Sequence, residues 1–182
     1  MTSYIFLTGN VGKIEEAANI FGEMLKFVSV DAEEIQSLDG EVVIKHKSLS
    51  TFKNYSSSFI GKFVFIEDTS LEIDNMNGFP GALVKFYYQS LGDEGLVKMN
   101  GGSKATMISW IAICDPTLNI TIKKFSSHGT ISREPRTGPY GFGFDAVFIP
   151  DGCTKSLAQM PPEEKNLYSS RCKAFTWIKN NH

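Results

Sequence analysis

The start of the chain restricts its possible folds most, because a short apolar run passes through a glycine turn into an amphipathic segment. Tyr4–Thr8 is predicted to be a buried strand that ends at Gly9 and Asn10. From Gly12 to Phe21, apolar side chains recur at spacings of three and four residues, which predicts a helix with one buried face. A strand that leads directly into a helix is typical of α/β proteins.

The rest of the pattern alternates helices with strands and then adds a hairpin. The predicted elements are a strand at Phe27–Val30, a helix over Val42–Phe59, a strand at Phe63–Ile66, a turn at Gly78–Gly81, a helix over Ala82–Leu91, hairpin strands at Ala105–Cys114 and Asn119–Ser127, a loop over Pro135–Gly143, a strand at Asp145–Ile149 and a helical tail over Pro162–Lys179. The tail is either continuous or broken near Ser169, which could cap a second helix. The order predicts an α/β fold with a mixed sheet.

The length and charge of the chain narrow the classes of function. Its 182 residues suit one domain, which we expect to span residues 1–182. With 18 Lys and Arg against 20 Asp and Glu, the net charge is −2, which argues against a nucleic-acid partner but allows a small anionic ligand. No segment approaches the ~20 apolar residues of a membrane span or has a signal-peptide pattern, so we expect no membrane partner and a cytoplasmic location.

The turn after the first strand has the composition of an anion-binding loop. In the segment Thr8–Lys13, free backbone N–H groups and the positive end of the helix dipole favour a phosphate. Thr8 and Asn10 add hydrogen-bond donors, and Lys13 adds a positive charge. The spacing differs from that of a Walker A loop, and a glycine turn beside a solvated lysine would have the same sequence.

Acidic residues stand beside two predicted elements. Glu67 and Asp68 directly follow the strand at Phe63–Ile66, and Glu41 stands at the turn before the helix over Val42–Phe59. Such carboxylates suit Mg²⁺, which takes one or two of them together with phosphate oxygens. Neighbouring strand residues face opposite ways, so Glu67 and Asp68 are expected to have different tasks. Taken singly, each acid is more often a surface charge.

Two later segments could contact a nucleotide. Glycines alternate with aromatic rings in Tyr140–Asp145, where a purine could stack on a ring, although such rings more often belong to a core. Lys165 and Arg171 would lie about 9 Å apart along a helix. On a continuous helix they would also point about 240° apart, so a shared ligand would require a break between them.

Read together and in order, these segments resemble the inosine triphosphate pyrophosphatase family. The matching motifs extend from Thr8 to about Ala174 and are found at Thr8–Lys13, Glu67–Leu71, Asn77–Gly81, Gly141–Asp145 and Glu163–Asn166. The resemblance implies an elongated mixed β-sheet with helices that form two lobes around a central cleft. It also implies a homodimeric, Mg²⁺-dependent hydrolase that converts ITP, dITP and XTP to the monophosphate and pyrophosphate, and so removes noncanonical purines from the nucleotide pool.

The resemblance also implies roles for individual residues. It implies that Asp68 and Lys13 are catalytic, with Asp68 ligating the metal or activating the attacking water. The remaining roles are triphosphate binding by Thr8, Asn10 and Lys13, substrate binding by Lys47, metal binding by Glu41 beside Asp68, base stacking by Phe142, and nucleotide contacts by Gly143, Asp145, Lys165, Ser170 and Arg171. A donor such as Arg171 would favour the 6-keto group of hypoxanthine or xanthine, since adenine's amine would be left unpaired there.

One departure from the family pattern bears on function. Ser170 stands where the family has a histidine that supports base recognition, so base selectivity is in question more than triphosphate cleavage. An alternative hypothesis is therefore a nucleotide-binding or regulatory module of the same fold that has lost useful catalysis. A third hypothesis is the same chemistry on another base, such as a modified pyrimidine triphosphate.

Overall fold

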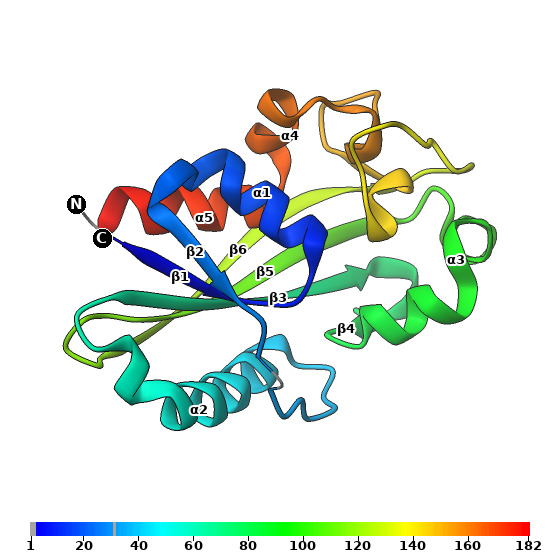
Figure 1. Cartoon of the computed structure of the whole chain (residues 1–182). Helices are drawn as coiled ribbons and strands as arrows, with labels where there is room; N and C mark the ends of the chain where they lie inside the picture. The colour runs from blue at the N-terminus through cyan, green and yellow to red at the C-terminus, as the bar shows by residue number, and fades with distance from the viewer. Residues whose placement is uncertain (1–2, 31) are drawn as a thin grey trace.

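The computed structural model of the chain describes residues 3–30 and 32–182. Seven strands in these residues form one mixed sheet in the order β2-β1-β3-β5-β6-β7, and β4 pairs with β3 beside this path (Figure 1). β1 is parallel to β2 and β3, whereas β3, β5, β6 and β7 are joined by antiparallel pairings. The α/β class with a mixed sheet is therefore confirmed.

The sheet has long strands at its centre and short ones at its edges. The strands are β1 (Tyr4–Leu7), β2 (Leu25–Val28), β3 (Phe63–Ile73), β4 (Pro80–Gly81), β5 (Lys104–Cys114), β6 (Ile120–Ile131) and β7 (Phe148–Pro150). The helices are α1 (Val11–Phe21), α2 (Gly40–Phe59), α3 (Val84–Asn100), α4 (Pro162–Tyr168) and α5 (Ser170–Asn181). Within the described part of the chain, no helix is long and apolar enough to cross a membrane.

The composition of β3 determines where the site lies. The strand is apolar over Phe63–Ile66, polar over Glu67–Ser70 and apolar again at Leu71 and Ile73, which are fully buried. The prediction that the strand ends at Ile66 is wrong. Its pairing with β5 continues to Ile73, because apolar side chains resume on the alternating positions of a strand. Glu67 and Asp68 therefore lie in the middle of a strand and not at its end.

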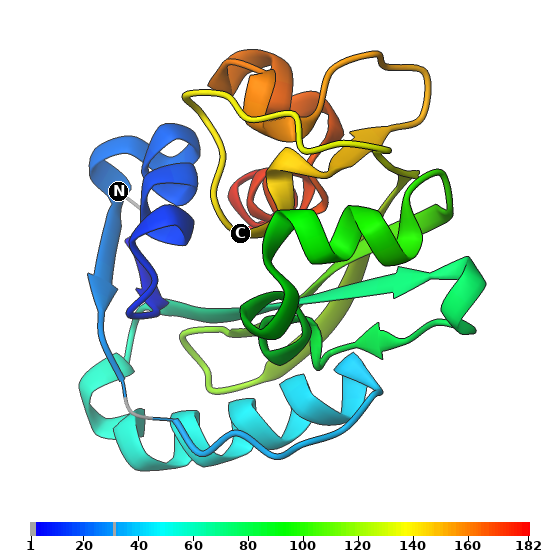
Figure 2. The same ribbon diagram turned by 90° about the vertical axis from the view of Figure 1, so that its right-hand side faces the viewer.

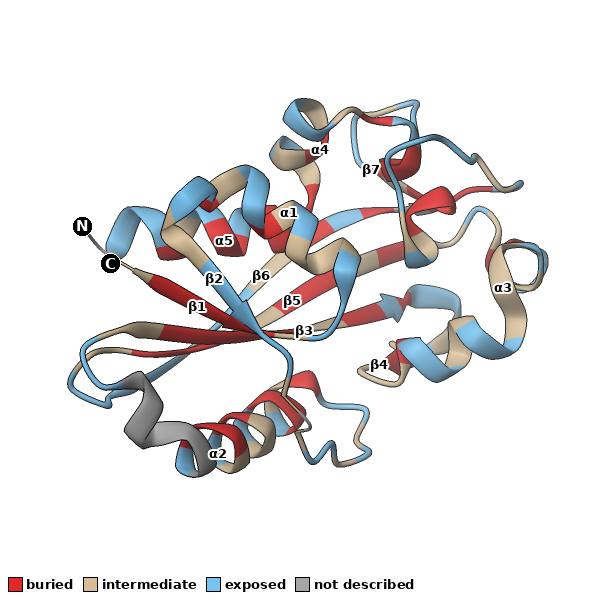
Figure 3. Ribbon diagram, viewed as in Figure 1, coloured by how far each residue is buried: buried red, intermediate tan, exposed pale blue. Residues whose placement is uncertain are grey.

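Three apolar clusters divide the molecule into two lobes. In the first lobe, one face of β1, β3 and β5 packs against α1 and α5 around Phe65 and Phe175, and the other face packs against α2 around Ile66 and Ile44 (Figures 1 and 2). The second lobe has a cluster of its own, in which Leu71 packs with side chains of α3, β6 and β7. Buried residues continue along the central strands into both lobes (Figure 3). The polar centre of β3 lies between these cores.

The connection from β3 to α3 is more regular than predicted. The turn expected at Gly78–Gly81 includes β4, in which Pro80 and Gly81 pair with Glu72 and Leu71 of β3. α3 extends past the predicted end at Leu91 to Asn100. It continues through a kink at Gly92, whose φ of 61° is accessible to glycine without strain.

The strand predicted over Asp145–Ile149 is wrong in its first half. Residues 143–146 form a 3₁₀ turn, and the strand β7 covers only Phe148–Pro150. The carboxylate of Asp145 accepts a hydrogen bond from the backbone N–H of Phe142, 3.0 Å away. This local bond competes with the extended conformation, since a short acidic side chain stabilises tight turns.

The C-terminal tail breaks at Ser169, which confirms one of the two interpretations of the sequence. Ser169 has an extended backbone between α4 and α5, and its Oγ accepts a hydrogen bond from the N–H of Cys172 at 3.4 Å. Its own N–H donates to the carbonyl of Lys165 at 2.9 Å and so closes α4. Ser169 thus ends one helix and caps the next.

Substituting this cap tests how much it stabilises the fold. Ser169→Ala is expected to lower the free energy of unfolding by about 1 kcal/mol, because the side chain that accepts the Cys172 N–H is lost. Urea unfolding followed by circular dichroism measures the change. Ser90→Ala in α3 is the matched control, since the hydroxyl of Ser90 bonds only to the Phe86 carbonyl of its own helix. Equal stability of the two variants would contradict the capping role.

Candidate active site

A cleft of about 810 Å³ opens over the polar centre of β3, between the two lobes. Its walls come from segments far apart in the sequence: the turn after β1, the connection between β2 and α2, the middle of β3, the start of α3, the loop before β7 and the start of α5. Charged and aromatic side chains among its lining residues are Lys13, Glu34, Lys47, Glu67, Asp68, Lys85, Phe86, Tyr88, Phe142, Phe144 and Arg171.

The turn after β1 is held by its own polar side chains. Thr8 Oγ1 accepts a hydrogen bond from the N–H of Asn10 at 3.1 Å, and Asn10 Oδ1 accepts one from the N–H of Lys13 at 3.0 Å. Asn10 is thus the N-cap of α1. These bonds use only the side-chain oxygens, so the hydroxyl hydrogen of Thr8 and the Nδ2 group of Asn10 are still donors that an anion could use.

Glu67 lies on the face of β3 that is turned toward α1 and α5. Its Oε2 is 2.8 Å from Lys13 Nζ and 3.2 Å from Arg171 Nε. Its Oε1 accepts hydrogen bonds from Ser109 Oγ at 2.5 Å and Thr69 Oγ1 at 2.9 Å. Burial alone would raise the pKa of Glu67, but the charges of Lys13 and Arg171 outweigh it and lower that pKa to about 2. Glu67 is therefore an ionised, fully paired carboxylate.

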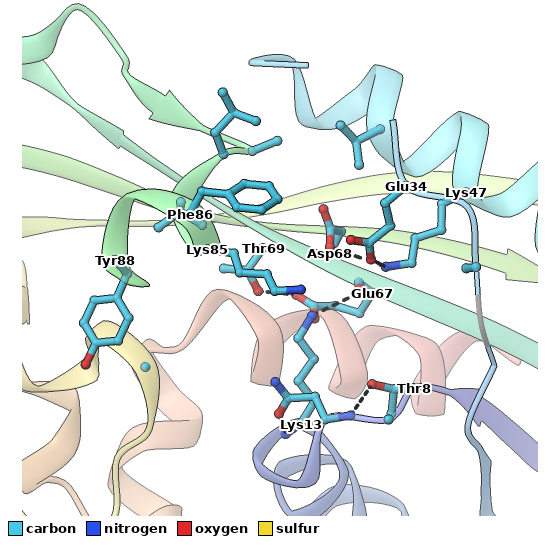
Figure 4. Close-up of a pocket in the computed structure, with 18 of the residues that line it drawn as sticks. Thr8, Lys13, Glu34, Lys47, Glu67, Asp68, Thr69, Lys85, Phe86 and Tyr88 are labelled. Carbon is cyan, nitrogen blue, oxygen red and sulfur yellow. Dashed lines mark hydrogen bonds and ion pairs between the residues drawn. The ribbon is translucent and has the colours of Figure 1, made fainter. Parts of the chain in front are cut away.

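Asp68 points to the opposite face, as the alternation of a strand requires. Lys47 Nζ, from α2, lies 3.7 Å from Asp68 Oδ1 and 2.6 Å from Glu34 Oε1. Figure 4 shows the ammonium group directed between the two carboxylates, while Glu67 and Lys13 meet on the other side of the strand. Burial raises the pKa of Asp68, and the charges of Lys13 and Lys47 oppose this only in part. The two adjacent acids have different environments, as predicted.

One predicted acid lies outside the cleft lining, and an acid that was not predicted lies within it. Glu41 lies in the first turn of α2, pairs with Lys45 one turn later at 2.5 Å and is not among the cleft-lining residues. Since Asp39 caps the helix just before Glu41, this part of α2 is fixed away from Asp68. The acid that shares Lys47 with Asp68 is Glu34, which the sequence did not single out. The sequence indicated Glu34 only weakly, because this residue lies beside other acids in the connection that leads from β2 to α2.

Behind the cleft lies a buried cluster of ion pairs centred on Glu16 of α1, a residue that the sequence reasoning missed. Lys165 Nζ lies 2.5 Å from one Glu16 oxygen, and Arg171 NH1 lies 2.5 Å from the other. On a continuous helix these two cations would point in different directions, and the break at Ser169 lets both contact the same partner, Glu16. Burial would raise the pKa of Glu16, but Arg171 and Lys165 outweigh it and lower that pKa. The sequence did offer one indication of this role, because Glu16 lies three residues after Lys13 in a predicted helix and so on the same side of it.

Phe142 covers this cluster on the cleft side. Its ring centroid lies 5.2 Å from Lys165 Nζ and 5.0 Å from the Arg171 guanidinium carbon. The ring also packs against Gly12, where an added Cβ would come within 2.6 Å of it. Arg171 still lines the cleft, whereas Lys165 does not. The aromatic ring thus separates Lys165, one of the residues predicted to contact the base, from the cleft.

The other predicted base-contacting residues lie at different depths. Gly143 lines the cleft next to Phe142. Asp145 is buried and pairs with Lys165 at 2.7 Å. Ser170 is buried at the first position of α5, and among the described residues its Oγ has no hydrogen-bond partner. Asp145 and Ser170 are not among the cleft-lining residues, so direct contact of either with a nucleotide stays a prediction.

The start of α3 supplies a wall that the sequence reasoning did not include. Lys85 and Phe86 are exposed and line the cleft, and the charge of Lys85 contributes to lowering the pKa of Glu34. In that shift, burial raises the pKa, and the hydrogen bond and charge of Lys47 outweigh it. Four cations therefore line one cleft, together with carboxylates that could hold a metal ion. An anion with several charges could be bound there without a net basic surface.

Residues 4–181 match the Ham1 family. A dITP/XTP pyrophosphatase of Methanopyrus kandleri is 35% identical to the chain, in an alignment that covers 97% of this chain and 96% of that protein. An inosine triphosphate pyrophosphatase of Yarrowia lipolytica is also 35% identical, over 97% of this chain and 94% of that protein.

Solved structures agree with this match. A HAM1 protein from Coxiella burnetii has a TM-score of 0.71 at 21% identity, and the Staphylococcus aureus Ham1 protein has a TM-score of 0.67 at 21% identity, each with 100% of both chains covered. At this identity the likeness concerns the fold, and it agrees with the two-lobed α/β architecture. The resemblance inferred from the sequence motifs is confirmed by the match over nearly the whole chain: this protein belongs to the Ham1 family.

Proposed function

We propose that this protein hydrolyses the triphosphates of noncanonical purine nucleosides, namely ITP, dITP and XTP, to the monophosphate and pyrophosphate. One observation carries the proposal: Lys13, Lys47, Lys85 and Arg171 line a single cleft with two carboxylates that share one cation. A nucleoside triphosphate brings roughly four negative charges, which such a set can neutralise together with Mg²⁺. The names of relatives aligned over almost the whole chain support the same chemistry.

Magnesium fits the residues present. The carboxylates of Glu34 and Asp68 both face Lys47 Nζ, so the protein already directs two acidic groups at one positive charge. Mg²⁺ takes one or two protein carboxylates and completes its coordination with phosphate oxygens and water. We assign Asp68 and Glu34 as the holders of the ion, which would polarise the phosphoryl group and lower the pKa of a bound water. Glu67 is excluded from this role because its oxygens are already paired.

Different side chains around the cleft would have different roles in the reaction. Lys13 and Lys85 would neutralise phosphate oxygens, with Thr8 and Asn10 donating hydrogen bonds at the turn after β1. Asp68 would orient the attacking water beside the ion and accept its proton. Cleavage releases pyrophosphate when the water attacks the phosphorus nearest the ribose.

The base would bind at the aromatic end of the cleft. A purine could stack on Phe142 and accept a hydrogen bond at its 6-keto oxygen from Arg171, whose guanidinium lies beside that ring. Homodimer formation and a cytoplasmic location belong to this proposal as well.

The direct test is pyrophosphate release from ITP by the purified protein in the presence of Mg²⁺. We expect turnover of ITP, dITP and XTP to exceed that of ATP by at least about 100-fold in kcat/KM, since a mispaired buried group discriminates strongly. A panel that includes modified pyrimidine triphosphates separates the three hypotheses. Tight ITP binding without product would favour the regulatory module, and equal turnover of ATP would contradict the proposed selectivity.

If Asp68 activates the attacking water, substituting it should abolish turnover and leave ITP binding intact. Asp68→Asn is expected to lower kcat by about 1,000-fold or more, because the base that activates water is lost. ITP binding, measured by calorimetry, should survive, since Lys13 and Lys85 are unchanged. The variant should also unfold at no lower temperature than the wild type, because the buried charge whose pKa the fold raises is removed. Undiminished kcat would remove Asp68 from the mechanism.

The two acids of the α2 region give a matched pair of variants. Glu34→Gln is expected to raise the Mg²⁺ concentration needed for half-maximal activity by about tenfold or more, since it removes one of two carboxylates at the ion. Glu41→Gln, seven residues away, should leave that concentration unchanged, because Glu41 pairs with Lys45 outside the cleft lining. The opposite result would restore the original sequence-based choice of Glu41.

A further inference from the structure

The position of Lys47 has a consequence for the order in which ligands bind. The side chain is mostly buried, with 13% of its surface exposed, and its ammonium contacts Glu34 at 2.6 Å and Asp68 at 3.7 Å. The contact with Glu34 is a short, charge-assisted hydrogen bond, whereas the distance to Asp68 is too long for one. Lys47 is therefore anchored to Glu34 and directed at Asp68 (Figure 4).

We propose that Lys47 is the built-in counter-ion of the Glu34–Asp68 pair, so that a divalent cation enters the pair only when phosphates draw the ammonium away. Two carboxylates carry a charge of −2, and Lys47 reduces the sum to −2 + 1 = −1. A divalent cation at the same carboxylates would meet the ammonium at close range, where unit charges in a partly buried site repel strongly. The metal and the ammonium thus compete for one place.

Among the described residues, Lys47 has no anionic partner besides Glu34 and Asp68, so a nucleotide in the cleft would supply a new one. Another carboxylate near the pair, Glu67, faces away; it forms ion pairs with Lys13 and Arg171 and accepts a hydrogen bond from Ser109. A triphosphate in the cleft would supply several anionic oxygens, and the four-carbon stem of a lysine allows its head group to move without the backbone. Nucleotide and metal are then expected to bind cooperatively, each favouring the other.

The inference rests on the proposed function for the identity of the nucleotide and for the carboxylates that hold the metal, and its test does not require turnover. Mn²⁺ serves as the probe, and the unbound ion is counted by electron paramagnetic resonance with and without the α,β-imido analogue of ITP, in which the bond that the proposed reaction breaks is replaced by a P–N–P bridge. For the wild type, we expect Mn²⁺ to bind weakly alone and at least about tenfold more tightly with the analogue.

The decisive variants are Lys47→Met and Lys47→Gln, whose unbranched stems are one atom shorter than that of lysine and which remove its charge. Both are expected to bind Mn²⁺ alone about tenfold or more tightly than the wild type, because one positive charge a few ångströms away is gone. Both should bind the metal-free analogue less tightly, since a phosphate partner is lost. Lys45→Met is the control: Lys45 is on the same helix but pairs with Glu41 outside the cleft lining, so its Mn²⁺ affinity should equal that of the wild type.

Two outcomes would overturn the inference. One is Mn²⁺ affinity in both Lys47 variants that is no higher than in the wild type, with folding verified by circular dichroism. The other is wild-type protein that binds Mn²⁺ alone as tightly as it does with the analogue. Failure of ITP hydrolysis in the wild type would contradict the proposed function instead, and it would leave the metal measurements on the Lys47 variants as an independent result.

Discussion

The buried carboxylate of Glu67 is the interaction on which the site depends. A charge in the middle of a strand that is apolar at both ends would be very costly if it were unpaired. Lys13, Arg171 and Ser109 converge on it from the start of α1, the start of α5 and the neighbouring strand β5. One anion therefore fixes three elements of the first lobe relative to the floor of the cleft.

The alternation of side chains along β3 links the pairing of Glu67 to the environment of its neighbour Asp68. Because successive side chains face opposite sides, the residue after Glu67 must point to the α2 face, where few groups satisfy it. In the described part of the chain, Asp68 has one ion-pair partner there, the ammonium of Lys47 at 3.7 Å, and burial raises the pKa of Asp68. The paired acid, Glu67, holds the framework together, and the poorly paired acid, Asp68, is the one to which we assign the chemistry. This division follows from adjacency on one strand, and the two roles could not be exchanged without rebuilding the surroundings.

The second group of ion pairs, around Glu16, fixes the helices that surround the aromatic end of the cleft. Lys165 and Arg171 come from different helices and are held by the two oxygens of one carboxylate. The break at Ser169 makes this geometry possible, and Phe142 lies over the result. Positive charge is thus kept near the proposed base site, balanced by internal anions. The net charge of −2 is accordingly a poor guide to the cleft, whose charges are concentrated and mixed.

The sequence by itself determined the α/β class, the strand–turn–helix at Thr8–Lys13, the hairpin and the family, because these depend on local periodicity and on motifs that are contiguous in the chain. It also indicated that Glu67 and Asp68 differ, since alternation is a local property of a strand. Only the tertiary structure decided that β3 continues past these acids, that Glu34 and not Glu41 lines the cleft and shares Lys47 with Asp68, and that Glu16 and Lys85 belong to the surroundings of the cleft. These facts depend on which distant segments meet across the sheet, and a carboxylate acquires its role from the cations that the fold brings to it.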